Sequence, residues 1–171
     1  MFRLRQEILK EVLSYLEKKG VPLTKIVIQK ALYFLKATGQ PVGYSFEPYA
    51  YGPFSVEVAE DLNDLCFWNE LEEKDSYLYV FKNFKEPKIE QQLKKKIKDK
   101  LDKYVDLLDK NFDFRNVELL GTVIYCCKAL KLSGDPLTPE NVIEEVKAWK
   151  GNKYSKKEIL TVFNKIKTLI N

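Results

Sequence analysis

Two segments of this chain are apolar around most of the surface that a helix would present, and they constrain the fold more than any other feature. In a helix of residues 24–38, apolar side chains would cover much of the circumference. Residues 117–132 are apolar nearly throughout. A helix that is hydrophobic all round is stable only when other elements cover it. We therefore predict two central helices, the first capped by Thr24 and ended by Gly39 and Pro41.

Further segments have the one-sided apolar stripe of helices that lie on such a core. Residues 4–16 have the i, i+4 rhythm and end at Gly20 in the position after the helix. Pro87 suits a first turn and begins a stripe of about six turns that ends at Leu108. Thr138-Pro139-Glu140 and the capping box Ser155-x-x-Glu158 are typical starts for two C-terminal helices.

Extended structure is predicted in two places between these helices. Residues 44–51 are rich in aromatic side chains, and Pro48 restricts such a strand to an edge or a bulge. Tyr51-Gly52-Pro53 then forms a sharp turn, and Ser55 caps a helix. Residues 67–71 and 77–81 are predicted to be strands joined by a turn, which makes a hairpin that could serve as a wing.

This order of elements predicts a mainly α (α+β) fold in two parts. Residues 1–86 form a winged-helix-like half with a short β-hairpin, and residues 87–171 form a helical region packed against it. The sequence leaves open whether the two parts are one continuous domain.

The composition excludes several classes of enzyme and of metal-binding protein. The chain has no histidine and its three cysteines form no CxxC motif, which excludes Ser-His-Asp triads, zinc fingers and histidine-based metallohydrolases. Glycine-rich nucleotide motifs are also missing, so we expect no catalytic residue, metal or cofactor. An N-terminus without a signal core and the lack of a ~20-residue apolar run predict a cytoplasmic protein. The 26 lysines beside three arginines, with abundant glutamate, are compatible with a thermophilic source.

The helix after Ser55 has four carboxylates, Glu57, Glu60, Asp61 and Asp64. A solvated helix face explains them best, and the alternative is an all-oxygen metal site of a metal-dependent nuclease. If this were the recognition helix of a winged fold, its charge would also repel phosphates.

Nucleic acid remains an alternative partner because lysines occur at two places. The candidates are Lys25, Lys30 and Lys36, or Lys94, Lys95 and Lys98. The second set alternates with acidic residues at helical spacing, which favours a solvated helix face.

Residues 25–35 read K-I-x-x-Q-K-x-x-Y-F-L, and residues 46–55 read F-x-x-Y-x-Y-G-P-F-S. Together with Ala59-x-x-Leu62, this layout resembles the YwgA-like family of bacteria and archaea and, more distantly, the Panacea domain of SocA-type antitoxins. The resemblance covers mainly residues 22–82. It implies a non-enzymatic module that neutralises a toxin or acts as a proteolytic adaptor. It marks as motif positions Lys30, Tyr33, Tyr51, Gly52 and Pro53.

The rings of residues 46–55 have two interpretations. Phe46, Tyr49, Tyr51 and Phe54 could wedge the strand and turn against the helix of residues 24–38, which we favour, or they could bind a partner. The candidate binding residues are Lys30, Tyr33, Tyr49, Tyr51, Gly52, Pro53 and Phe54.

Our leading hypothesis is thus a cytoplasmic, non-enzymatic protein-interaction module, antitoxin-like or adaptor-like, on a winged-helix-like scaffold. A DNA-binding transcriptional regulator is the alternative, and a metal-dependent nuclease is a third. The sequence names no partner protein and leaves open a homodimer.

Overall fold

The computed structural model describes residues 2–170, and these form a mainly α fold with two small antiparallel hairpins. The helices within this range are α1 Phe2–Lys18, α2 Lys25–Ala37, α3 Val56–Phe67, α4 Gln91–Leu108, α5 Phe114–Ser133, α6 Pro139–Lys150 and α7 Lys156–Ile166. The strands are β1 Glu47–Tyr49, β2 Gly52–Phe54, β3 Leu71–Lys74 and β4 Tyr77–Val80.

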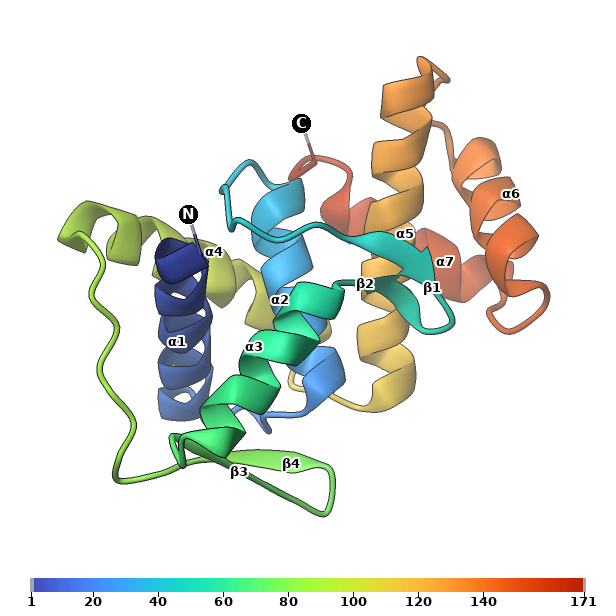
Figure 1. The fold of residues 1–171 in the computed structure, drawn as a ribbon. Helices are drawn as coiled ribbons and strands as arrows, with labels where there is room; N and C mark the ends of the chain where they lie inside the picture. The colour runs from blue at the N-terminus through green and yellow to red at the C-terminus, as the bar shows by residue number, and fades with distance from the viewer. Residues whose placement is uncertain (1, 171) are drawn as a thin grey trace.

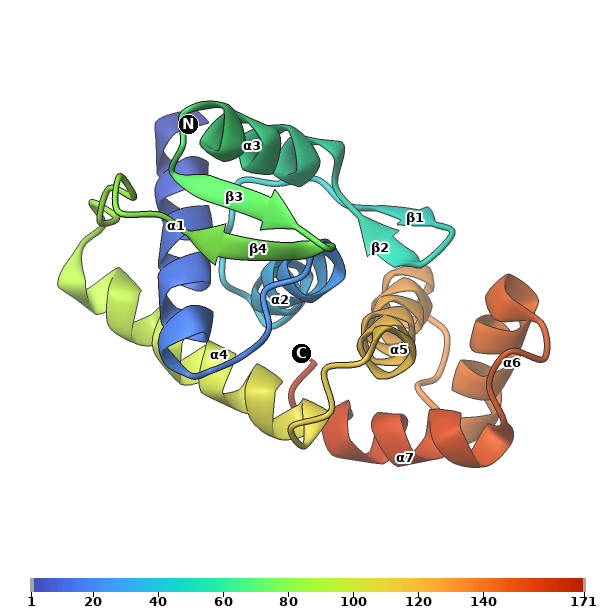
Figure 2. The same cartoon turned by 90° about the horizontal axis from the view of Figure 1, so that it is seen from below.

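Helices α2 and α5 lie side by side in the middle of the molecule, as predicted (Figure 1). Nearly every side chain of α2 is buried, and α5 is buried along most of its length. Helices α1 and α4 cover one side of this pair, and α6 and α7 cover the other side of α5 (Figure 2). A single cluster of buried apolar side chains extends from α1 to α7, so the two predicted regions share their core.

The N-terminal half has the element order of a winged helix. Between α1 and α2, the Leu23 carbonyl accepts a hydrogen bond from the Leu78 N–H at 2.7 Å, and Thr24 forms a bridge with Tyr77 of β4. The β3–β4 hairpin is therefore fastened to the start of α2, in the position of a wing. Hairpin β1–β2 is inserted between α2 and α3 and packs on α2 and α5.

The predicted caps are confirmed. Thr24, Ser55 and Thr138 each accept a hydrogen bond from the backbone N–H three residues later. Ser155 and Glu158 form the reciprocal capping box. Gly20, with φ of 72°, follows the end of α1. No helix within residues 2–170 is both long and apolar enough to cross a bilayer.

Three predicted boundaries were wrong. The strand predicted over residues 67–71 runs from Leu71 to Lys74 instead, because α3 continues to Phe67 and the left-handed Asn69 (φ 56°) precedes the strand. Pro87 does not begin α4, which starts at Gln91, because the Lys88 N–H bonds the Glu7 carboxylate at 2.7 Å and holds this segment extended along α1.

Residues 52–54 are also more than a turn. They form strand β2, which pairs with β1 so that Tyr49 lies opposite Gly52 and Pro48 lies opposite Pro53. Neither proline has a backbone N–H to donate, and each lies between the neighbouring pairs Glu47–Phe54 and Tyr49–Gly52 of this short ladder.

Candidate functional site

The candidate site is the hairpin of residues 46–55, here called the aromatic turn. Helix α2 fixes its second strand through two neighbouring side chains. The Gln29 amide donates to the Ser55 carbonyl at 2.8 Å and accepts from the Ser55 N–H at 2.9 Å. The Lys30 ammonium donates to the Pro53 carbonyl at 2.8 Å. These bonds fasten the second strand and the residue that caps α3 to helix α2.

Lys30 is an anchor rather than a surface cation. Its side chain lies between α2 and α5, where only 3% of the residue is exposed. A Cβ added to Gly121 of α5 would lie 2.8 Å from the Lys30 Cδ, so glycine at 121 makes room for the lysine stem. Burial lowers the pKa of Lys30 to about 8, although the nearby Glu118 charge acts in the opposite direction.

Glu118 of α5 organises the other side of the turn. It is fully buried, and its carboxylate accepts hydrogen bonds from Lys150 at 2.9 Å and Lys153 at 2.6 Å. Burial by itself would raise the pKa of Glu118, but the hydrogen bonds and charges of both lysines together lower it. Lys150 also donates to the Ala50 carbonyl at the tip of the turn. One buried carboxylate thus ties the turn to α5 and α6.

The glycine of the turn is required by this packing. Gly52 has φ of 90° and is buried against α2 and α5. A Cβ there would lie 3.2 Å from both the Lys30 Cε and the Thr122 Oγ1. A side chain at this position would therefore be strained by its backbone conformation and would also displace the anchor.

The rings of the aromatic turn separate into two groups. Phe46 is half-buried with its ring edge on the Tyr33 ring at 5.3 Å, and Phe54 is half-buried beside Tyr49 at 5.6 Å. Tyr49 and Tyr51, however, are 65% and 55% exposed. The prediction that all four rings wedge against α2 was wrong for these two: the Tyr49 ring contacts Phe54 within the hairpin, and the Tyr51 ring contacts Phe114 of α5 at 4.9 Å.

The sequence-predicted residues consequently occupy different environments. Lys30, Gly52 and Pro53 are buried in the anchor, and Tyr33 is buried beneath Phe46. Only the two exposed tyrosines and part of Phe54 are accessible to a partner.

Sequence reasoning missed the residues that hold the turn from the C-terminal half, Glu118, Lys150 and Lys153. Lys150 and Ala50 are 100 positions apart. A glutamate near the start of a helix that is apolar on most sides was the available signal, because a buried carboxylate requires a cationic partner.

Most lysines considered for nucleic acid are engaged within the protein. Lys25 pairs with Glu73 at 2.7 Å and Lys36 donates to the Tyr44 carbonyl at 2.9 Å. Lys94 and Lys98 both face the buried Glu11 carboxylate, at 3.3 Å and 3.9 Å. With Lys30 buried as well, Lys95 is the exposed member of the two sets for which the structure gives no partner.

The carboxylates of α3 do not converge. Asp61 is buried and receives a two-point ion pair from Arg5, at 3.0 Å and 3.2 Å, together with a 2.8 Å hydrogen bond from the Tyr44 hydroxyl. Glu57 accepts from the Ser55 hydroxyl at 2.8 Å. Among residues 2–170 there is no group of three or more acidic or cysteine side chains suited to a metal ion.

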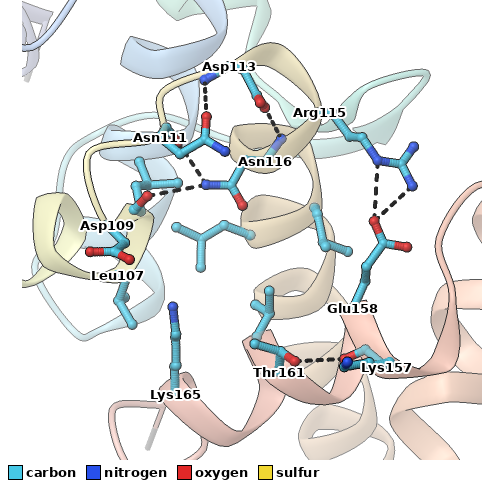
Figure 3. Close-up of a pocket in the computed structure, with 14 residues that line it drawn as sticks. Leu107, Asp109, Asn111, Asp113, Arg115, Asn116, Lys157, Glu158, Thr161 and Lys165 are labelled. Atoms are coloured by element: carbon cyan, nitrogen blue, oxygen red, sulfur yellow. Dashed lines mark hydrogen bonds and ion pairs between the residues drawn. The ribbon is translucent and has the colours of Figure 1, made fainter.

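A separate pocket of about 430 Å³ lies between the end of α4, the start of α5 and α7 (Figure 3). Its floor includes Leu119 and Val162, and its rim has charges of both signs. Arg115 and Glu158 on this rim pair with each other at 2.9 Å. This pocket is a weaker candidate than the aromatic turn, because two of its charged side chains pair with each other and its lining has no aromatic ring.

Comparison of the sequence with models of known protein families finds no match, and neither does comparison with curated proteins.

Proposed function

We propose that this protein is a non-enzymatic protein-interaction module on a winged-helix-like scaffold, and that its contact surface is the aromatic turn. The observation that carries the proposal is the contrast within this hairpin. Its backbone is held by buried side chains from α2 and α6, while Tyr49 and Tyr51 keep 65% and 55% of their surface exposed beside their ring contacts with Phe54 and Phe114. The resemblance to antitoxin-like and adaptor-like families agrees with this role.

Exposed tyrosines on a rigid support suit protein recognition for two reasons. Tyrosine supplies a large contact area with few rotatable bonds, and it is enriched among residues that dominate binding energy. A turn that is already fixed also loses little conformational entropy when a partner binds.

The alternative of DNA binding is less well supported. The recognition-helix position of a winged helix is occupied by α3, whose exposed Glu60 and Asp64 would face the phosphates. Four of the six candidate lysines neutralise carboxylates or bind carbonyls at the surface, and a fifth is buried. Within these two sets, Lys95 is the exposed lysine for which the structure gives no partner that would compete with a phosphate.

The test is affinity capture from cells of the source organism, comparing the wild type with the double variant Tyr49→Ser/Tyr51→Ser. Trp68→Ser is the matched control, because Trp68 is 68% exposed and lies at the end of α3, away from the turn. We expect a protein that the wild type and the control both retain and the double variant loses. Melting temperatures should stay close together, because all three side chains are exposed.

Identical capture by all three proteins would contradict the proposal. So would tight binding of duplex DNA that weakens steeply between two salt concentrations.

A further inference from the structure

A second pocket adjoins the aromatic turn, and its residues suit one particular kind of side chain. It has a volume of about 430 Å³ and lies between β1, α5 and α6. Its lining consists of Pro48, Tyr125, Cys126, Ala129, Glu145, Ala148 and Trp149. Since Pro48 belongs to β1, a partner that covers the exposed tyrosines of the turn can also reach this pocket.

Two aromatic rings form the main walls of the pocket. The rings of Tyr125 and Trp149 have centroids 5.2 Å apart and planes inclined at 60°. Both residues are only partly buried, so part of each ring remains open to the pocket. Inclined aromatic walls of this kind attract cations over their faces, and the alkyl stem of lysine or arginine packs well on such surfaces.

The charge near this pocket is negative. Glu145 is the one charged residue in the lining, it is exposed, and within residues 2–170 it forms no hydrogen bond or ion pair. Glu47 precedes Pro48 and is also exposed. Its charge adds to the effect of burial in raising the pKa of Tyr125, which places its carboxylate near the phenol.

Lys150 lies beside the Trp149 ring, but its ammonium is bonded to groups outside the pocket. The Lys150 ammonium lies 4.8 Å from the centre of the Trp149 ring, which shows that this indole accepts a cation. However, Lys150 is committed to Glu118 and the Ala50 carbonyl, and it does not line the pocket. The Glu145 carboxylate is therefore left without a cation.

We propose that this pocket binds a lysine or arginine side chain of the partner protein, with the alkyl stem against Tyr125 and Trp149 and the positive charge at Glu145. This inference rests on the proposed function, because it specifies the chemistry of a partner at the same surface. An acidic or phosphate-bearing ligand would meet the repulsion of two carboxylates. A purely apolar side chain would displace water from Glu145 without replacing its hydrogen bonds.

The cysteine in the lining does not compete with this role. Cys126 is only 2% exposed, and burial raises the pKa of its thiol to about 12. The thiol is therefore neutral near pH 7 and acts as an apolar wall.

The test uses the fluorescence of Trp149. Of the two tryptophans, Trp68 is exposed and distant from the pocket, so the variant Trp68→Phe leaves Trp149 as the single reporter. This variant is titrated with the peptide acetyl-Ala-Lys-Ala-amide and with the same peptide in which norleucine replaces lysine. The second peptide keeps the alkyl stem and lacks the charge.

We expect a saturable change with the lysine peptide at millimolar concentrations, and binding of the norleucine peptide that is weaker by about tenfold. In the same background, Glu145→Gln should weaken binding of the lysine peptide severalfold and should not weaken binding of the norleucine peptide. Glu144→Gln is the matched control, because Glu144 is exposed on the same helix but does not line this pocket.

Three results would overturn the inference: no saturable change up to about 50 mM peptide, equal binding of both peptides, or equal effects of the two glutamate substitutions. None of these results would contradict the proposed function, which is tested by capture through Tyr49 and Tyr51. Conversely, if the double variant Tyr49→Ser/Tyr51→Ser captured the same proteins as the wild type, the proposed function would fail even where the lysine peptide still bound the pocket.

Discussion

Replacing Glu118 with glutamine should destabilise the fold strongly, because its carboxylate is fully buried and compensates two lysines. The size of the effect follows from the exposure of each lysine. Lys153 has 38% of its side chain exposed, so it can turn to water when the carboxylate is neutralised. Lys150 has only 5% exposed, and its ammonium would stay buried with the neutral glutamine and the Ala50 carbonyl.

Because one buried charge is left without its partner, the free energy of unfolding should fall by about 3 kcal/mol. This is the low end of the ~3–5 kcal/mol that breaking a buried ion pair costs. With a urea m-value of about 2 kcal/mol per molar, the midpoint should fall by roughly 1.5 M. The assay is equilibrium unfolding in urea followed by far-UV circular dichroism. Glu73→Gln is the control, because its pair with Lys25 is 40–49% exposed, and it should cost less than about 1 kcal/mol.

The destabilisation caused by Glu118→Gln should also depend on pH. The pKa of Glu118 is lowered in the folded protein, so the stability that its charge contributes is present above the pKa of the unfolded chain and is lost as the pH falls through the folded pKa. The difference between wild type and Glu118→Gln should therefore shrink in acid. A loss as small as that of Glu73→Gln, or a difference that does not change down to about pH 3, would refute the reasoning.

Three further predictions concern the anchor and the thiols. Gly52→Ala and Gly39→Ala share positive φ values of 90° and 85°, but only the former meets neighbouring atoms within 4 Å; Gly52→Ala should cost about 2 kcal/mol more in urea unfolding, and equal losses would argue against a packed turn. The pKa of Lys30 is about 8 in the folded protein and 10.5 ordinarily. As the pH rises from 8 to 10.5, the wild type should therefore gain unfolding free energy relative to Lys30→Met, by at most about 1.4 kcal/mol per pH unit. A stability difference between the two proteins that does not change with pH would contradict a buried lysine. Burial raises the pKa of the thiols of Cys126 and Cys127 to about 12, so both should resist a disulfide reagent at pH 8 until the protein unfolds, and rapid labelling would be inconsistent with this core.

The helices of this protein could be predicted because their signals are local. The caps at Thr24 and Ser155 depend on residues three positions apart, and the apolar stripes depend on the helical repeat. The winged-helix order followed from the same local patterns. The start of α4 was predicted wrongly because a distant residue decides it: Glu7 of α1 binds the backbone N–H of Lys88, the residue after Pro87.

The candidate site divides in the same way. The sequence by itself determined that extended structure near Pro48 is followed by a sharp change of direction before the cap at Ser55, because proline and glycine restrict the backbone wherever they occur. Only the tertiary structure decided that Lys30 and Pro53 belong to an anchor, that Glu118 is the ion held by two lysines, and that Tyr49 is left in solvent. Burial and ion pairing depend on which segments meet in space, and that is set by the packing of α2 against α5 rather than by any local pattern.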